Sequence, residues 1–368
     1  LYEMRDHMID YKNNIINVSN SILRYYNAKT HHETLPLLDE IFHRKYKHVI
    51  VMLLDGMGIN VLNMFREDSI FKKHLKTKLS TVFPPTTVAA TNAFLAGKTP
   101  LETGFLGWSQ YNPFADVTDE IFTRSNYFTH DKIKNNLYDY LLKDNFLKQI
   151  KKVNPHLHIE ELYPAPINGS TYESFDAMLK RLIEITKGET SLSYCYYTEP
   201  DATIHMNGLH SEKTIQTLEE LNTKITEFSN KLKDDTLLII VADHGIVDIE
   251  YIYLDDIEEI YQTFIRMPSI ESRAKTFFIK ENEKEKFEKL FNKHFQPGFK
   301  LLTKEEALNQ NLFGFGQKHP LIDTFLGNYI AISTSNKAIE FSKDSSPFKA
   351  HHAGYTKEEL EIPLIIFE

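Results

Sequence analysis

The chain of 368 residues is 42% hydrophobic and 25% charged, with a formal net charge of −9. It is long enough for one large core, or for a core with an insertion. The acidic balance argues against binding of a nucleic-acid polymer, which needs clustered Lys and Arg, but leaves a small nucleotide open as a substrate. The single cysteine, Cys195, excludes an intramolecular disulfide and a cysteine-based zinc site.

The sequence gives no sign of a membrane segment. No apolar run approaches the about 18 residues of a membrane helix. The N-terminal stretch LYEMRDHMIDYKNN is too polar for a secretory signal. We therefore expect no membrane span and a cytoplasmic protein, and the sequence does not predict an oligomeric state.

The predicted elements alternate between helices and buried strands. Two helices are predicted first, over residues 15–27 and 35–46. Continuous apolar runs at 48–54, 191–198 and 236–242 are typical of strands buried on both faces. Between the last two runs, apolar residues at helical spacing predict a helix with one buried face: Ile215, Leu218, Ile225, Phe228 and Leu232. Strand, helix and strand in this order predict a parallel sheet flanked by helices, in the α/β class.

A charged stretch over residues 255–347 interrupts this pattern. We interpret it as an inserted α+β cap, because it holds two strand-like stretches and one helix-like stretch, at 274–280, 328–334 and 281–295. In this interpretation residues 1–254 and 348–368 form the core domain.

Acidic side chains follow the predicted buried strands, and two of them have a histidine close behind: Asp55; Asp201 with His205; Asp243 with His244. Two further histidines, His351 and His352, precede the last apolar run. Sites in open parallel sheets form at the carboxyl ends of the strands. Carboxylates and imidazoles that converge there suit a pair of divalent metals and metal-assisted hydrolysis of a phosphate-like ester.

The segment VFPPTT offers a nucleophile. Pro84 and Pro85 end an extended stretch and predict a helix that starts near Thr86. A threonine hydroxyl there lies beside the free N–H groups of the helix, and a bound metal can activate it. The alternative is that Thr86 and Thr87 only cap the helix, which is the commoner role.

Each motif is weak alone, but the ordered set is specific: LLDGMG, VFPPTT with LAGKTPLETG, YTEPDATIHMNG, VADHG and HHAGY. This set resembles the alkaline phosphatase superfamily, most closely its nucleotide pyrophosphatase/phosphodiesterase branch, the type I phosphodiesterase-like proteins. The resemblance implies an alkaline phosphatase-like, mostly parallel central sheet and a site with two divalent ions. Zinc is expected, and such nitrogen and oxygen ligands also accept manganese or iron.

The resemblance also implies residue roles. One metal would be held by Asp55, Asp243 and His244, and the other by Asp201, His205 and His352. Thr87, bound to the first metal, would attack phosphorus to give a phosphothreonine, which a metal-bound hydroxide would release. Thr87 is preferred to Thr86 by counting back from the shared Gly97, and His352 to His351 because a Gly-containing turn follows it. In both cases the neighbouring residue stays open.

One position departs from the family. The residue three places after Thr87 is an asparagine in that branch and holds a phosphoryl oxygen, whereas here it is Ala90. Asn92 lies nearby but faces elsewhere on a helix, which leaves the backbone N–H groups as the alternative. Trp108 and Tyr111 are candidates for stacking on a flat leaving group, with packing against the cap as the alternative.

Three functions follow in order of preference. The first is hydrolysis of phosphodiester or phosphoanhydride bonds in a small phosphate ester, possibly a nucleotide. The second is a phosphomonoesterase or a phosphonate (phosphonoacetate-type) hydrolase on the same scaffold. A monoesterase needs extra positive charge, and Arg124 is the nearest candidate in sequence. The third is a non-catalytic metal-binding homologue.

Overall fold

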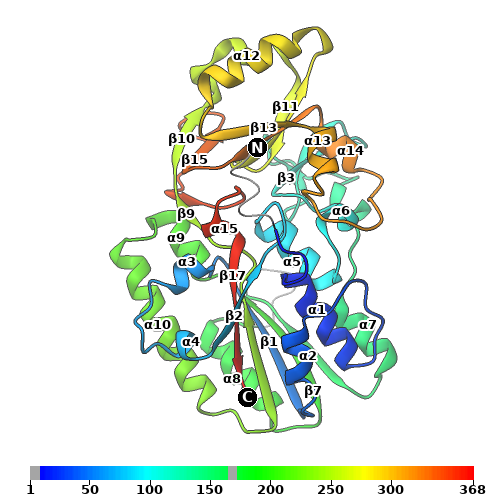
Figure 1. The fold of residues 1–368 in the computed structure, drawn as a ribbon, viewed down its shortest axis with the longest axis vertical. Coiled ribbons are helices and arrows are strands. Elements are labelled where there is room, and N and C mark those ends of the chain that lie inside the picture. The colour runs from blue at the N-terminus through cyan, green and yellow to red at the C-terminus, as the bar shows by residue number, and fades with distance from the viewer. Residues whose placement is uncertain (1–8, 165–171) are drawn as a thin grey trace.

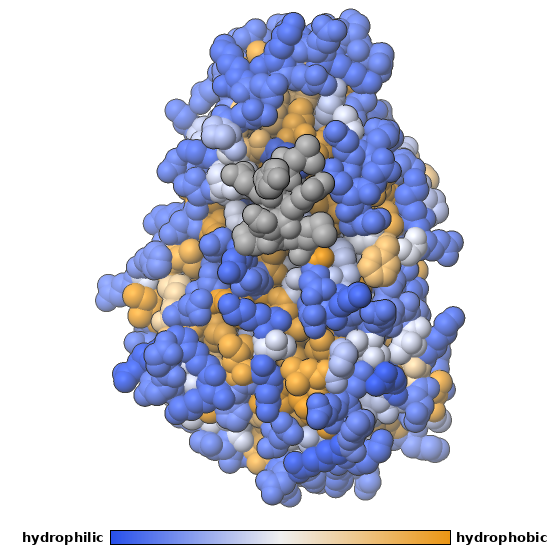
Figure 2. All heavy atoms as spheres, in the orientation of Figure 1, coloured by the Kyte–Doolittle hydropathy of each residue, from blue (hydrophilic) through white to orange (hydrophobic). Residues whose placement is uncertain are grey.

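The computed structural model describes residues 9–164 and 172–368 (Figure 1). A six-stranded sheet organises the lower half of the view, and a seven-stranded sheet organises the upper half. Figure 2 shows a mostly polar surface at the upper end, over α12 (Lys284–His294). Within the described ranges, no helix has the length and apolar character needed to cross a membrane.

The six-stranded sheet is mostly parallel. Its order is β2-β17-β8-β1-β7-β6. The bounds are β1 (His48–Leu54), β2 (Leu75–Ser80), β6 (His158–Leu162), β7 (Ser191–Tyr197), β8 (Thr236–Val241) and β17 (Glu361–Phe367). β1 pairs in parallel with β7 and β8, and β6 pairs in parallel with β7, whereas β17 runs antiparallel to both its neighbours. The predicted α/β class and the three predicted buried strands are confirmed.

Two groups of helices flank this sheet (Figure 1). One group contains α1 (Ile15–Tyr25), α2 (Pro36–Ile41), α5 (Thr87–Ala96) and α7 (Phe146–Val153), in which α1 contacts the other three. The other contains α4 (Ile70–Lys73), α8 (Phe175–Ile185), α9 (Asp201–Asn207) and α10 (Glu212–Ser229), in which α10 contacts the other three. Further short helices are α3 (Ile59–Leu62), α6 (Pro100–Thr103), α11 (Glu258–Tyr261) and α15 (Lys357–Leu360).

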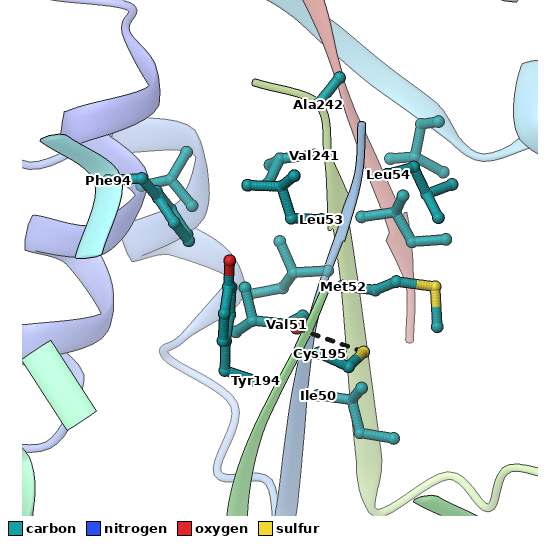
Figure 3. Packing of buried hydrophobic residues seen from close by; sticks show 14 of the residues in the cluster. Ile50, Val51, Met52, Leu53, Leu54, Phe94, Tyr194, Cys195, Val241 and Ala242 are labelled. Carbon is teal, nitrogen blue, oxygen red and sulfur yellow. Dashed lines mark hydrogen bonds between the residues drawn. The ribbon is translucent and has the colours of Figure 1, made fainter. Parts of the chain in front are cut away.

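The central strand β1 explains why its sequence is continuously apolar. All seven of its residues are buried, because helices cover both faces of the sheet. Val51 and Leu53 point toward Phe94 of α5 and Tyr194, and Met52 points to the opposite face (Figure 3). Cys195 is fully buried beside β1, where its thiol contacts the Val51 carbonyl.

The buried face of α10 differs from the prediction. Its buried residues include Leu221, whereas Ile215 is 48% exposed and Leu232 lies beyond the helix. At 3.6 residues per turn, Ile215 lies about 60° from Leu218, on the side away from Leu221. The prediction that Ile215 belongs to the buried face was therefore wrong.

The seven-stranded sheet combines distant segments in the order β13-β14-β12-β11-β3-β4-β5. Its strands are β3 (Ser109–Asn112), β4 (Val117–Glu120), β5 (Ser125–Asn126), β11 (Phe264–Ile270), β12 (Ala274–Ile279), β13 (Phe299–Thr303) and β14 (Tyr329–Ser333). It carries α12, α13 (Lys304–Asn309) and α14 (Ile322–Leu326). The remaining strands pair as β9 (Val247–Asp248) with β16 (Ala350–His351), and β10 (Glu250–Tyr253) with β15 (Lys337–Glu340).

The strand-like and helix-like stretches expected in the cap correspond to β12, β14 and α12. The same sheet also takes in β3 to β5, which precede residues 255–347 in the chain. The division into a core domain (1–254 and 348–368) and a cap (255–347) stays a prediction.

Candidate active site

The carboxyl ends of three neighbouring parallel strands bring the predicted aspartates together. Asp55 directly follows β1, and Asp243 follows β8 after one residue. Asp201 begins α9 just after β7, and its N–H donates to the carbonyl of Asp55 at 3.1 Å. Gly56 permits this approach, because it adopts φ +68° and a Cβ there would lie 2.7 Å from the Cβ of Asp201.

The first half of the site surrounds the hydroxyl of Thr87. Thr87 Oγ1 lies 3.4 Å from both carboxylate oxygens of Asp55 and 3.2 Å from His244 Nε2. His244 Nε2 is 3.6 Å from Asp243 Oδ2. Asp243 Oδ1 accepts hydrogen bonds from the N–H groups of Gly56 and His244, at 3.0 Å each. One aspartate oxygen is thus fixed by backbone, and the other faces the histidine.

The second half of the site combines a helix and the C-terminal loop. Asp201 and His205 lie one turn apart on α9, with Asp201 Oδ2 3.1 Å from His205 Nε2. His205 Nδ1 lies 2.7 Å from the Ala350 carbonyl, and His352 Nδ1 lies 3.2 Å from that of Pro85. An imidazole held at Nδ1 presents Nε2 as a ligand atom, which is the usual arrangement of metal-binding histidines.

Two groups of side chains are close enough to hold a metal ion. One is Asp201, His205 and His352, and the other is Asp55, Asp201 and His244; in each group the ligand atoms lie within 4.8 Å of one another. Asp201 belongs to both groups, so the two positions adjoin. His351 joins neither group within the described residues. Asp243 is in neither group but faces His244 beside them.

The electrostatics of this cluster favour an added cation. Burial raises the pKa of Asp55 well above its ordinary value, and the charges of Asp243 and Asp201 raise it further. Burial likewise raises the pKa of Asp243. For Asp201, burial opposes ionisation but the partner His205 outweighs it, so its pKa is lowered. Burial, with His244 and His205 nearby, holds the pKa of His352 well below its usual range, so its imidazole stays neutral.

The aspartates also lack partners that would balance them. Across residues 9–164 and 172–368 no Lys or Arg forms an ion pair with them, and their only ion-pair partners are His205 and His244. Asp201 Oδ1 and Asp243 Oδ2 are buried without a hydrogen-bond partner among those residues. Buried charge is stable only when it is paired or coordinates a metal, and these nitrogen and oxygen donors fit zinc, manganese or iron.

The two threonines have different surroundings. Thr86 is the N-cap of α5, and its hydroxyl donates to Glu271 Oε1 at 2.7 Å. Thr87 is the first residue of the helix, and only its hydroxyl faces Asp55 and His244. Ala90 is buried, and Asn92 Nδ2 donates back to the Val88 carbonyl at 2.8 Å.

The predicted substrate contacts lie on the seven-stranded sheet, the second sheet of the molecule, or next to it. Trp108 is 39% exposed and meets Phe122 edge-on, with ring centroids 5.9 Å apart. The ring of Tyr111 is covered by the guanidinium of Arg266, 3.6 Å from its centroid. Arg124, the candidate for balancing a second phosphate charge, stacks on Tyr138.

Sequence reasoning missed several residues that support the site. Tyr196 donates a hydrogen bond to Asp55 Oδ2, and Thr81 donates one to the backbone carbonyl of Asp243. Both lie in stretches whose pattern indicates only buried or extended chain, so no local signal marks them. Glu271 is buried against the start of α5, although its sequence neighbourhood suggests an exposed turn.

The chain matches known proteins over most of its length. A family model described as type I phosphodiesterase / nucleotide pyrophosphatase matches residues 49–313. The chain belongs to this family. The type I phosphodiesterases and nucleotide pyrophosphatases are metal-dependent hydrolases, and the protein is therefore a phosphodiesterase/pyrophosphatase hydrolase. A search of curated proteins found no match.

Solved structures share the fold of this type I phosphodiesterase. Murine ectonucleotide pyrophosphatase/phosphodiesterase 5 matches with a TM-score of 0.65 at 17% identity, over 86% of this chain and 87% of that one. The human protein of the same name gives 0.66 at 16%, over 86% and 87%. An inactive threonine-to-alanine variant of the murine protein, in complex with AMP, gives 0.64 at 16%, over 87% of each chain.

Proposed function

We propose that this hydrolase cleaves phosphodiester or phosphoanhydride bonds in small phosphate esters, with Thr87 as nucleophile and two divalent metal ions, most simply zinc. One ion would be held by Asp55, Asp243 and His244, with Thr87. The other would be held by Asp201, His205 and His352. The observation that carries the proposal is the convergence of three buried aspartates and three histidines beside one hydroxyl, where no Lys or Arg of the described residues forms an ion pair with the aspartates.

The residues of the chain divide the chemistry between them. Bound metals supply positive charge that activates a hydroxyl or water and stabilises the oxygens of the displaced group. Asp55 and His244 orient the Thr87 hydroxyl, which passes its proton to solvent water and attacks phosphorus. The bond from phosphorus to the leaving oxygen breaks, and a phosphothreonine forms. Water then attacks phosphorus and gives up a proton, the bond from phosphorus to the Thr87 oxygen breaks, and that oxygen takes a proton as the phosphate or its monoester leaves.

A nucleotide is the substrate class with most support. The murine relative of this fold is seen with AMP, in a threonine variant named inactive. The half-exposed ring of Trp108 is available to stack on a nucleobase, a contact that is worth about 1–3 kcal/mol elsewhere. Tyr111 is the weaker candidate, because Arg266 covers its ring.

The test compares hydrolysis of bis-p-nitrophenyl phosphate with that of p-nitrophenyl phosphate, after chelation and after zinc or manganese is restored. We expect a clear preference for the diester that is lost on chelation and returns with metal. A preference for the monoester would favour the phosphomonoesterase or phosphonate hydrolase instead. Equal activity after chelation would contradict the metal-dependent mechanism.

A further inference from the structure

A buried acid of the second sheet reaches the first turn of the helix that carries Thr87. Glu271 lies between β11 and β12, and its side chain is 6% exposed. Its Oε1 accepts a hydrogen bond from Thr86 Oγ1 and another from the N–H of Trp108, both at 2.7 Å. Glu271 therefore joins the start of α5 to the loop before β3.

This contact changes what Thr86 does for the helix. A threonine at the N-cap usually accepts a hydrogen bond from an N–H group of the first turn. The side chain of Thr86 makes no such bond, and its hydroxyl is directed to Glu271 instead. The helical hydrogen bonds begin with the N–H of Ala90 to the Thr86 carbonyl, at 2.9 Å.

The first N–H groups of α5 consequently stay free beside the nucleophile. Those of Thr87, Val88 and Ala89 have no hydrogen-bond acceptor in the described part of the chain. Free N–H groups at a helix start bind phosphate oxygens well. They are also the donors that remain for the phosphoryl group, because the side chain of Ala90 has no polar atom and the side chain of Asn92 donates to the Val88 carbonyl of its own helix.

The backbone before Glu271 supports a dedicated role. Ile270 adopts φ +81°, a conformation that β-branched residues rarely take. Such strain persists only where the surroundings impose it, and it is frequent at functional sites. Here Ile270 is held between Ser109 of β3 and Lys275 of β12. The sheet therefore sets the position of the Glu271 carboxylate.

We propose that Glu271 is a positioning residue, which holds the Thr86 hydroxyl away from the first turn of α5 and so keeps its N–H groups free for the phosphoryl group. This inference rests on the proposed function, in which Thr87 attacks that group. The substrate oxygens would gain these bonds most fully in the transition state, so the effect should fall on kcat more than on KM.

The experiment measures kcat and KM for bis-p-nitrophenyl phosphate with metal-loaded Glu271→Ala, Glu271→Gln and the double variant Glu271→Ala/Thr86→Val. Glu271→Ala frees the threonine to cap the helix, and kcat should fall about 10²-fold, the cost of one oxyanion donor. Glu271→Gln keeps an acceptor oxygen and should retain most activity. Valine cannot cap, so the double variant should recover about tenfold over Glu271→Ala.

Two controls separate positioning from folding. Glu340→Ala removes another buried acid of the same region, which pairs with Lys275 and, within the described residues, makes no hydrogen bond or ion pair with α5; its kcat should stay close to that of the wild type. If Glu271→Ala does not fold, Glu271→Asp replaces it, because its side chain is one methylene shorter. Its kcat is compared with that of the wild type, and a fall in kcat is again expected.

The outcomes also separate this inference from the proposed function. A wild-type kcat in Glu271→Ala, or a double variant no better than Glu271→Ala, would overturn the positioning role while the loss of activity in Thr87→Ala still identified the nucleophile. An inactive metal-loaded wild type, or an active Thr87→Ala, would instead overturn the proposed function and this inference with it.

Discussion

Two buried charge clusters of this protein differ in how their charge is balanced. At the ends of the parallel strands, Asp55 and Asp243 both face His244, and no arginine or lysine of the described residues pairs with either carboxylate. Near the second sheet, Arg273 donates to both carboxylate oxygens of Glu359, at 2.7 and 2.8 Å, and both side chains are fully buried. The same burial thus produces a complete ion pair in one place and an unbalanced cluster in the other.

The balanced pair serves the fold, whereas the unbalanced cluster serves the site. Glu359 also accepts a hydrogen bond from the N–H of Gly354, at 2.7 Å, and so fixes the turn after His352. The Arg273–Glu359 pair holds the loop, and the aspartate cluster leaves charge for a ligand. A paired buried charge stabilises a fold only modestly, but the loss of one partner is costly. An unpaired cluster should gain stability from a bound cation.

The largest expected effect concerns the hydroxyl beside the unbalanced cluster. Thr87→Ala should lower kcat by about 10³-fold or more, because it removes the nucleophile. Its metal content should change little, since the aspartate and histidine ligands remain. Thr91→Ala is the matched control, because Thr91 lies one turn along α5 and donates only to the Thr87 carbonyl. Similar activity in both variants would show that Thr87 is not the nucleophile.

The balanced pair should be costly to break. Arg273→Met leaves the carboxylate of Glu359 buried without its partner, and the free energy of unfolding should fall by about 3–5 kcal/mol. Chemical denaturation of the metal-free protein measures this. A loss below about 1 kcal/mol, typical of exposed pairs, would show that the pair contributes little to the fold.

The unbalanced cluster should behave in the opposite way. Asp243→Asn keeps an oxygen for the N–H groups of Gly56 and His244 but removes one of the repelling charges. The variant should lose one metal equivalent by elemental analysis, while the metal-free protein is at least as stable as the wild type. Unchanged metal content would contradict the assignment of Asp243 as a metal ligand.

The pH dependence of metal stabilisation gives a smaller and more specific signal. Burial, with Asp243 and Asp201 nearby, raises the pKa of Asp55 above the value of about 3.9 in an unfolded chain. The folded metal-free protein therefore keeps protons that the unfolded chain loses, so this contribution to stability declines as pH rises. Because metal replaces these protons, zinc should raise Tm more at about pH 8 than at about pH 6. An equal or larger gain at the lower pH would contradict this.

The smallest expected effect concerns substrate contact. Trp108→Ala should raise KM for a dinucleotide or nucleotide diester by a factor equivalent to about 1–3 kcal/mol, with less change for bis-p-nitrophenyl phosphate. Tyr111→Leu should have a weaker effect, because Arg266 already covers the ring of Tyr111. A larger effect on KM from Tyr111→Leu than from Trp108→Ala would indicate that the leaving group binds closer to β3.

Much of the aspartate cluster could be predicted from sequence for a physical reason. Strands buried on both faces have continuous apolar runs, and the polar residue that ends each run must lie at the edge of the sheet. Asp55, Asp201 and Asp243 follow this rule, and the spacing of Asp201 and His205 matches one helical turn.

The second sheet and its contacts could not be predicted in the same way. The pairing of Ser109 with Ile270 joins segments far apart in the chain, and no local periodicity encodes it. Glu271 lies in a short polar turn that is usually exposed, and its burial follows from that distant pairing. Tyr196 reads as one more aromatic residue of a strand, so its bond to Asp55 becomes visible only in the fold.

The most direct test of the central claim is an anomalous-scattering crystal structure of the protein with zinc. The account predicts two zinc peaks, one among Asp55, Asp243 and His244 beside Thr87, and one among Asp201, His205 and His352. A single peak, or zinc bound outside this cluster, would contradict the two-metal site.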